Sequence, residues 1–140
     1  MKNIQPVGLL VGRVFLAYIF VLAGFHKIGG FSATAAYMAS KGLPMSEVLL
    51  VATIVIEFIG GLMIALGWKA RWAALAIFVF LIPTTLIFHA FWTVDPEQVR
   101  SQMIQFNKNL AIMGGMLYVA VFGSGRYSLD RGSKHVEGKE

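Results

Sequence analysis

The sequence has 140 residues, of which 57% are hydrophobic and 14% charged, and its mean hydropathy is +0.71. Soluble domains average about 45–50% apolar and about 25% charged residues, so this composition excludes an ordinary soluble domain and favours an integral membrane protein. The absence of cysteine excludes disulfides and thiol chemistry by the chain's own side chains. The net charge of +5 does not indicate a nucleic-acid partner, because membrane orientation accounts for the basic residues.

Four long apolar stretches account for the composition, and they cover residues 7–25, 48–68, 72–92 and 103–122. Each is close to the ~20 residues that a helix needs to cross a ~30 Å hydrocarbon core. The short loops between them leave no room for a soluble domain. We therefore predict an all-α integral membrane protein, a single four-helix transmembrane bundle over residues 1–130. A cleaved signal peptide is disfavoured by the length of the first stretch and by a basic residue inside it.

The connections between the spans also contain structural signals. Residues 29–45, "GGFSATAAYMASKGLPM", predict a short helix in the first outer loop, with Ser32 as N-cap and Gly42 as stop. Apolar side chains such as Phe31 and Met38 suit a helix that lies on the membrane interface. Pro96 stands at a plausible first position of the last helix.

Basic residues predict the orientation of the bundle. With four spans, the amino terminus, the second loop and the tail share one side of the membrane. That side carries Lys2, Lys69, Arg71, Arg126, Arg131, Lys134 and Lys139. The positive-inside rule then places both termini in the cytoplasm. The expected location of the protein is the inner (plasma) membrane. The polar residues 131–140 predict a disordered cytoplasmic tail.

Two charged residues lie inside the apolar stretches. At about 1.5 Å per residue, Glu57 lies roughly 15 Å from the outer boundary and Arg13 roughly 9 Å from the cytoplasmic one. Their axial separation is then only about 6 Å, so we expect them to form an ion pair inside the bundle. Arg13 and Lys27 also share one helical face of the first span with Ala17 and Gly24.

A second polar set lies toward the outer ends of the spans. It consists of His26, Lys27, His89, Asn107, Lys108 and Asn109. Together with Glu57 and Arg13, these side chains predict a polar-lined cavity that opens to the outside. Intramembrane ionisable groups are functional candidates by default. We assign candidate catalytic roles to Glu57, Arg13 and His89.

The remaining polar residues are candidates for substrate binding, namely Lys27, Asn109, Lys108 and His26. Structural roles compete with these assignments. Arg13 and Glu57 would also serve to fix helix register, His89 to hydrogen-bond interfacial water, and the His26–Lys27 pair to end a span. A haem bound by His26 and His89 lacks a supporting motif, and no metal-ligand spacing is present.

Several segments together resemble the DoxX family over roughly residues 7 to 130. They are "GRVFLAYIFVLAGFHKIGGF" (12–31), "YMASKGLP" (37–44), "IEFIGGLMIALGWKARWAAL" (56–75), "FHAF" (88–91) and "NKNLAIMGGMLYVAVFGSGRYSLD" (107–130). The chain is similar to the small bacterial inner-membrane branch, several members of which carry the label oxidoreductase. The family's name is linked to thiosulfate:quinone oxidoreductase. The resemblance implies recurring polar positions at Arg13, Lys27, Glu57, His89 and Asn109, and all five are present.

Two functions follow as hypotheses. The first is a redox-linked component, in which a quinone or another lipophilic oxidant enters the cavity and electrons come from a redox or periplasmic partner protein. The sequence has no nucleotide-binding loop that could hold an electron-carrying cofactor. The second is a non-enzymatic protein for small-solute binding, transport or membrane-complex assembly. Oligomeric state, substrate and partner are not encoded in any motif.

Overall fold

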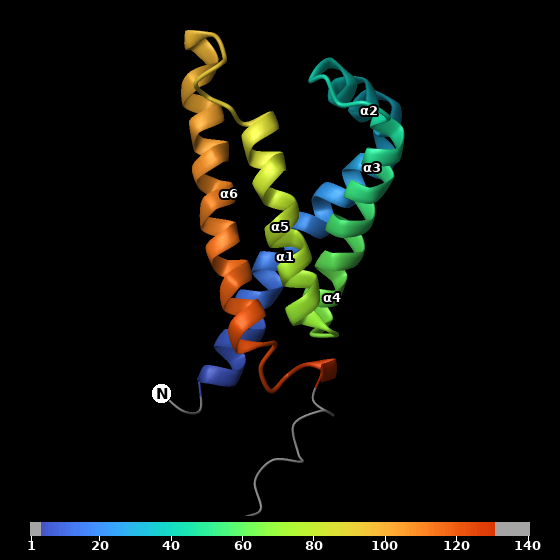
Figure 1. Cartoon of the computed structure of the whole chain (residues 1–140). Helices are drawn as coiled ribbons and strands as arrows, with labels where there is room; N and C mark the ends of the chain where they lie inside the picture. Colours follow the sequence, from blue (N-terminus) through green and yellow to red (C-terminus); the bar gives the residue numbers. More distant parts are fainter. Residues whose placement is uncertain (1–3, 131–140) are drawn as a thin grey trace, which may run out of the picture.

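The computed structural model describes residues 4–130, and every regular element in that part of the chain is a helix (Figure 1). In chain order the elements are α1 (Gln5–Gly29), α2 (Phe31–Ser40), α3 (Ser46–Ile54), the π-helix η1 (Val55–Ile59), α4 (Gly60–Leu66), α5 (Ala70–Phe88) and α6 (Pro96–Phe122). Because α3, η1 and α4 follow one another without a break, they form one continuous rod. The first and last described residues lie at the same end of the molecule (Figure 1). The predicted disordered tail, 131–140, lies outside the described residues.

Three segments of the described chain are long and apolar enough to cross a membrane: Gln5–Gly29, Ser46–Leu66 and Ala70–Phe88. They correspond to the first three predicted spans, although each boundary is shifted. The third helix ends at Phe88, before the predicted limit at residue 92, because the aromatic residues that follow form a turn. Hydropathy does not distinguish such an apolar turn from a helix. The rings of Phe91 and Trp92 in this turn pack against Phe106 of α6.

Helix α6 begins earlier than the predicted fourth span. Pro96 occupies its first turn, as the sequence suggested, and the helix then runs to Phe122. Its opening turns are polar, so hydropathy alone placed the start at residue 103. α6 packs along α5, and the pair stands apart from α2 and α3 at the end opposite the termini (Figure 1).

The short helix in the first connection is present as α2, but its start and its role differ from the prediction. It begins at Phe31 with Gly30 at the N-cap, so Ser32 lies inside the first turn. Gly42 follows the helix with φ of +81°, which supports its role as a stop. Met38 is buried and packs against Leu50 of α3. The helix therefore covers a small hydrophobic cluster, and an interfacial position alone does not account for it.

Two glycines allow the backbone of α1 to approach η1 and α4 closely. A Cβ on Gly24 would lie 2.7 Å from the Cβ of Phe58, and one on Gly61 would lie 2.9 Å from Cγ2 of Val21. Small residues at such positions let membrane helices approach closely. These contacts fix the antiparallel register of the two helices.

The buried side chains confirm the predicted face of α1. Arg13, Ala17, Phe20 and Gly24 are its buried residues. Ala17 and Phe20 join the central cluster, which also includes Ile64 of α4. The remaining buried members come from α5 and α6 and are Ala70, Ala73, Ala74, Ile77, Leu81, Met116 and Val119.

Candidate functional site

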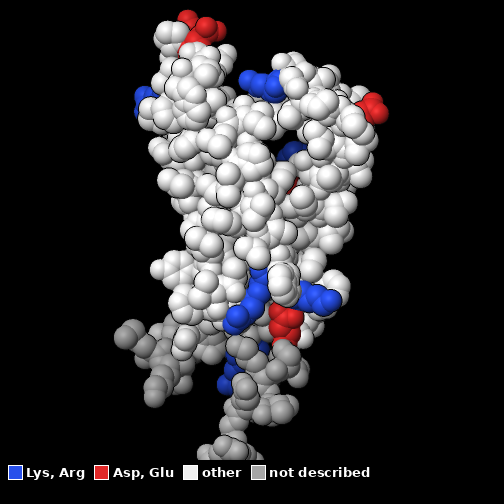
Figure 2. All heavy atoms as spheres, viewed as in Figure 1, with Lys and Arg blue, Asp and Glu red and all other residues white. Residues whose placement is uncertain are grey.

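A cavity of about 300 Å³ lies between α1, α2, the α3–η1 rod, α5 and α6, toward the α2 end of the molecule. Figure 2 shows an opening in the upper half of the molecule, with basic and acidic atoms visible at its bottom. Most of the lining is apolar. The polar and aromatic groups in it are Phe20, Lys27, Thr34, Tyr37, Thr53, Glu57, Phe80, Thr84, Phe88, His89, Lys108 and Asn109.

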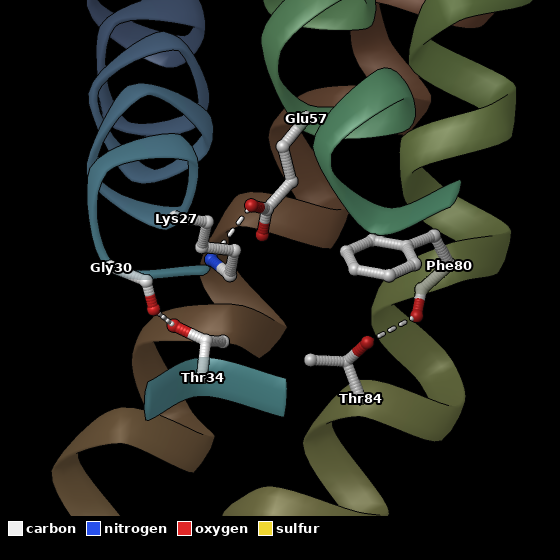
Figure 3. A network of polar contacts seen from close by, with 6 residues as sticks. All are labelled: Lys27, Gly30, Thr34, Glu57, Phe80 and Thr84. Atoms are coloured by element: carbon white, nitrogen blue, oxygen red, sulfur yellow. Dashed lines mark hydrogen bonds and ion pairs between the residues drawn. The ribbon is translucent and has the colours of Figure 1, made fainter. Parts of the chain in front are cut away.

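The charged centre of the cavity is an ion pair. The ammonium of Lys27 lies 2.7 Å from Oε2 of Glu57, and these side chains are 27% and 8% exposed (Figure 3). A buried carboxylate is costly unless it is paired, and Lys27 provides the opposite charge. Lys27 is in the last turn of α1, where a cation also interacts favourably with the helix dipole.

Glu57 is the central residue of the π-helix η1. In this turn the N–H of Gly60 points back to the carbonyl of Val55, five residues earlier. π-Turns are rare and occur frequently at functional sites. No pattern in the sequence indicated this turn, because its residues are ordinary helix formers for an apolar environment.

Three further predicted residues reach the same cavity. Nδ1 of His89 lies 2.9 Å from Oε1 of Gln102, which holds the imidazole at the end of α5. The amide of Asn109 donates to the hydroxyl of Thr85 at 3.0 Å. Lys108 is exposed at the rim and donates to Gln105. The structure therefore brings Lys27, Glu57, His89, Lys108 and Asn109 together, as the sequence suggested.

Sequence reasoning missed two threonines of this cavity, Thr34 and Thr84. The hydroxyl of Thr34 donates to the carbonyl of Gly30 at 2.9 Å, and that of Thr84 donates to the carbonyl of Phe80 at 2.8 Å. Figure 3 shows both hydroxyls turned toward the backbone of a nearby helix turn, with the two methyl groups facing one another. A signal for Thr84 was available, since a threonine inside an apolar helix commonly bonds back to the carbonyl four residues earlier, here that of Phe80.

Arg13 does not pair with Glu57, so that prediction was wrong. Its guanidinium donates to three main-chain carbonyls, those of Ala65 at 3.2 Å, Tyr127 at 2.7 Å and Ser124. It also interacts electrostatically with Asp130. Arg13 thus anchors the segment 123–130 that follows α6, at the end of the molecule opposite the cavity, and it is not among the cavity-lining residues.

The register of α1 against α4 explains the error. Gly24 faces Phe58, and Val21 faces Gly61. Continuing this antiparallel register places Glu57 about one residue past Gly24, which is about 12 residues or roughly 18 Å along α1 from Arg13. The prediction assumed that the two spans begin and end at equal depths, and glycine contacts that only the tertiary structure shows decide otherwise.

Asp130 completes the anchor at this end. Its carboxylate accepts the N–H groups of Lys69 at 2.6 Å and Ala70 at 3.2 Å, which caps the start of α5. Its own N–H donates to the carbonyl of Gly67 at 2.9 Å. His26 is also placed differently from the prediction, because it is exposed on α1 and is not part of the cavity lining.

Comparison with known proteins identifies relatives over most of the chain. The DoxX family model matches residues 8–90. Inner membrane protein YphA of Escherichia coli (strain K12) is 37% identical over 127 residues, covering 91% of each chain. Inner membrane protein YqjF of the same organism is 40% identical over 131 residues, covering 94% of this chain and 95% of the relative.

A more distant similarity links the chain to a eukaryotic protein. The ER-derived vesicles protein ERV29 of Saccharomyces cerevisiae is 28% identical over 82 residues, which are 59% of this chain and 26% of ERV29. No solved structure matches.

Proposed function

Because this chain belongs to the DoxX family and its bacterial relatives are inner membrane proteins, we propose that it is a redox-linked inner-membrane component whose cavity binds the head of a lipophilic quinone. One observation carries the proposal: the ion pair of Lys27 and Glu57 is the charged centre of an otherwise largely apolar cavity. Ligand sites commonly combine an apolar lining with a few convergent polar groups.

The proposed membrane arrangement has four crossings, with α6 as the fourth. The polar opening turns of α6 then project beyond the hydrocarbon region, at the same end of the molecule as α2. Lys69, Arg71 and Arg126 lie toward the end that holds the described chain termini, and the positive-inside rule assigns that end to the cytoplasm. The cavity, at the α2 end, then belongs to the outer half of the membrane, where it is accessible to a ligand that partitions into lipid.

The cavity residues provide the proton chemistry that a quinone requires. Reduction of a quinone to its quinol takes up two electrons and two protons, and Glu57 is placed to exchange a proton with the bound head. Lys27 and His89 both line the cavity, and in this proposal they hydrogen-bond the oxygen atoms of the head. The electrons pass to or from a redox partner protein. Arg13 has no part in this proposal, since it binds the carbonyls of the C-terminal segment.

Mass spectrometry of the organic extract tests the proposal. Protein purified in detergent from its native membrane is compared with Glu57→Gln and with His26→Ala, a matched control on an exposed position outside the cavity. We expect a quinone to co-purify with the wild type and with His26→Ala, and to be depleted several-fold from Glu57→Gln. Extracts that contain only bulk lipid in all three preparations would contradict the proposal.

A second candidate is a non-enzymatic role in solute binding, transport or membrane-complex assembly. The similarity to ERV29 favours it, because that protein is named for ER-derived vesicles and its name carries no redox activity. In this case Glu57→Gln would disturb uptake, resistance or complex formation while the quinone pool of the membrane kept its ratio of oxidised to reduced forms. Measuring that ratio in cells that carry each variant separates the two candidates.

A further inference from the structure

The ion pair in the cavity has an ammonium with protons left to donate and a carboxylate with one oxygen left to accept. Lys27 gives one of its three ammonium protons to Oε2 of Glu57. Among the described residues 4–130, the hydrogen bond to the Glu57 side chain reaches Oε2, and the other carboxylate oxygen, Oε1, is left open. Unused ammonium protons and an unused carboxylate oxygen therefore lie within one ion pair that is 2.7 Å long.

Two of the threonines that line the cavity, Thr34 and Thr84, add no further donor. The hydroxyl protons of Thr34 and Thr84 are committed to the carbonyls of Gly30 and Phe80. Their methyl groups face one another across the space beside the ion pair (Figure 3). At this point of the cavity, the polar recognition of a ligand falls on Lys27 and Glu57, and the threonines contribute apolar contact.

A hydroxyl group fits this pair better than a carbonyl group does. Its oxygen accepts from Lys27 while its proton is donated to Glu57. A carbonyl oxygen only accepts, so it would satisfy Lys27 and place its lone pairs beside the carboxylate oxygen. We infer that the cavity selects a lipophilic ligand with a hydroxyl-bearing head, the phenolic or quinol form, over the corresponding quinone. This inference rests on the proposed function and names the redox form that the site binds.

Selection of the reduced form also has an electrochemical consequence. A protein that binds the quinol more tightly than the quinone raises the reduction potential of the bound couple. For a two-electron couple, a tenfold preference corresponds to about 30 mV. The cavity would thus stabilise the quinol until a stronger oxidant accepts its electrons.

Calorimetric titration of the purified full-length chain in detergent tests the inference with three probes. They are 4-hexylphenol, its methyl ether 4-hexylanisole, which lacks the donor proton, and 2-methyl-1,4-naphthoquinone. We expect the phenol to bind at least tenfold more tightly than the ether, and more tightly than the quinone. In Glu57→Gln the preference for phenol over ether should fall at least threefold, because the charged acceptor is lost.

His26→Ala is the matched control, since this side chain is exposed on α1, adjacent in sequence to Lys27 but outside the cavity lining. Its phenol-to-ether ratio should equal that of the wild type. Equal binding of phenol and ether, or tighter binding of the quinone, would overturn the inference and leave the proposed function standing. If none of the three probes binds the wild type, the proposed function fails, and the inference fails with it.

Discussion

Replacement of Arg13 by methionine should loosen the C-terminal segment 123–130 around Ser124 and Tyr127 and leave the helices folded. The guanidinium donates to the carbonyls of Ser124, Tyr127 and Ala65, and two of these three acceptors belong to the segment. Hydrogen bonds from a charged donor contribute about 1.5 kcal/mol each at the low end, so the two that reach the segment contribute about 3 kcal/mol together. Methionine keeps the length of the apolar part of the side chain and removes every donor.

The segment contains its own reporter. Arg126 is exposed, and trypsin cleaves after it only when the surrounding backbone is released. An attachment of about 3 kcal/mol corresponds to about two decades, or roughly a hundredfold, in the population of the released state. Desolvation of the buried guanidinium offsets part of this, so we expect cleavage after Arg126 to be faster by about 30-fold or more in Arg13→Met. Arg13→Lys, with one compact ammonium, should fall between the two.

Mass spectrometry of the fragments follows the assay, and cleavage after Lys41 serves as the internal control for global unfolding. Equal cleavage rates after Arg126 in wild type and Arg13→Met would refute the anchoring role. Equal acceleration at both sites would show that the variant unfolds as a whole. The same comparison made on Glu57→Gln should show no change after Arg126, because Glu57 belongs to the other end of the molecule.

The remaining predictions concern packing, pairing and orientation. Gly24→Ala should lower the melting temperature in detergent and reduce the free energy of unfolding by about 1–3 kcal/mol, because its Cβ would lie 2.7 Å from a neighbouring side chain. Gly12→Ala, whose Cβ would have no heavy atom within 4 Å, should leave the melting temperature unchanged. Equal melting temperatures of the two variants would refute the close contact. The exchange Lys27→Glu with Glu57→Lys should accumulate to a higher level in membranes than either single change, as measured by immunoblot; a double variant no better than the singles would argue against a direct pair. In sealed vesicles, trypsin should cleave after Arg126 only in inverted preparations, and cleavage in right-side-out vesicles would reverse the proposed orientation.

Much of the candidate site followed from helix periodicity and residue type. A 3.6-residue repeat places residues four and three apart on one face, so the buried face of α1 from Arg13 to Gly24 was predictable from the sequence. Polar residues in apolar helices turn inward because lipid does not solvate them, and this brought Lys27, Glu57 and Asn109 to one cavity. Both arguments use only the chain's own local order and its solvent.

The pairing of these residues depended on contacts between helices. Counting depth along each span predicted that Glu57 pairs with Arg13. The close approach of the helices at Gly24 and Gly61 sets a different register, in which Glu57 pairs with Lys27. The amino-acid sequence alone determined that the helices are apolar and which face of each is polar. Hydrophobicity and helical period are properties of a single segment, so neither requires knowledge of the other helices. The tertiary structure alone decided the register of one helix on another and the return of the C-terminal segment to Arg13, because both depend on atoms that are far apart in the chain.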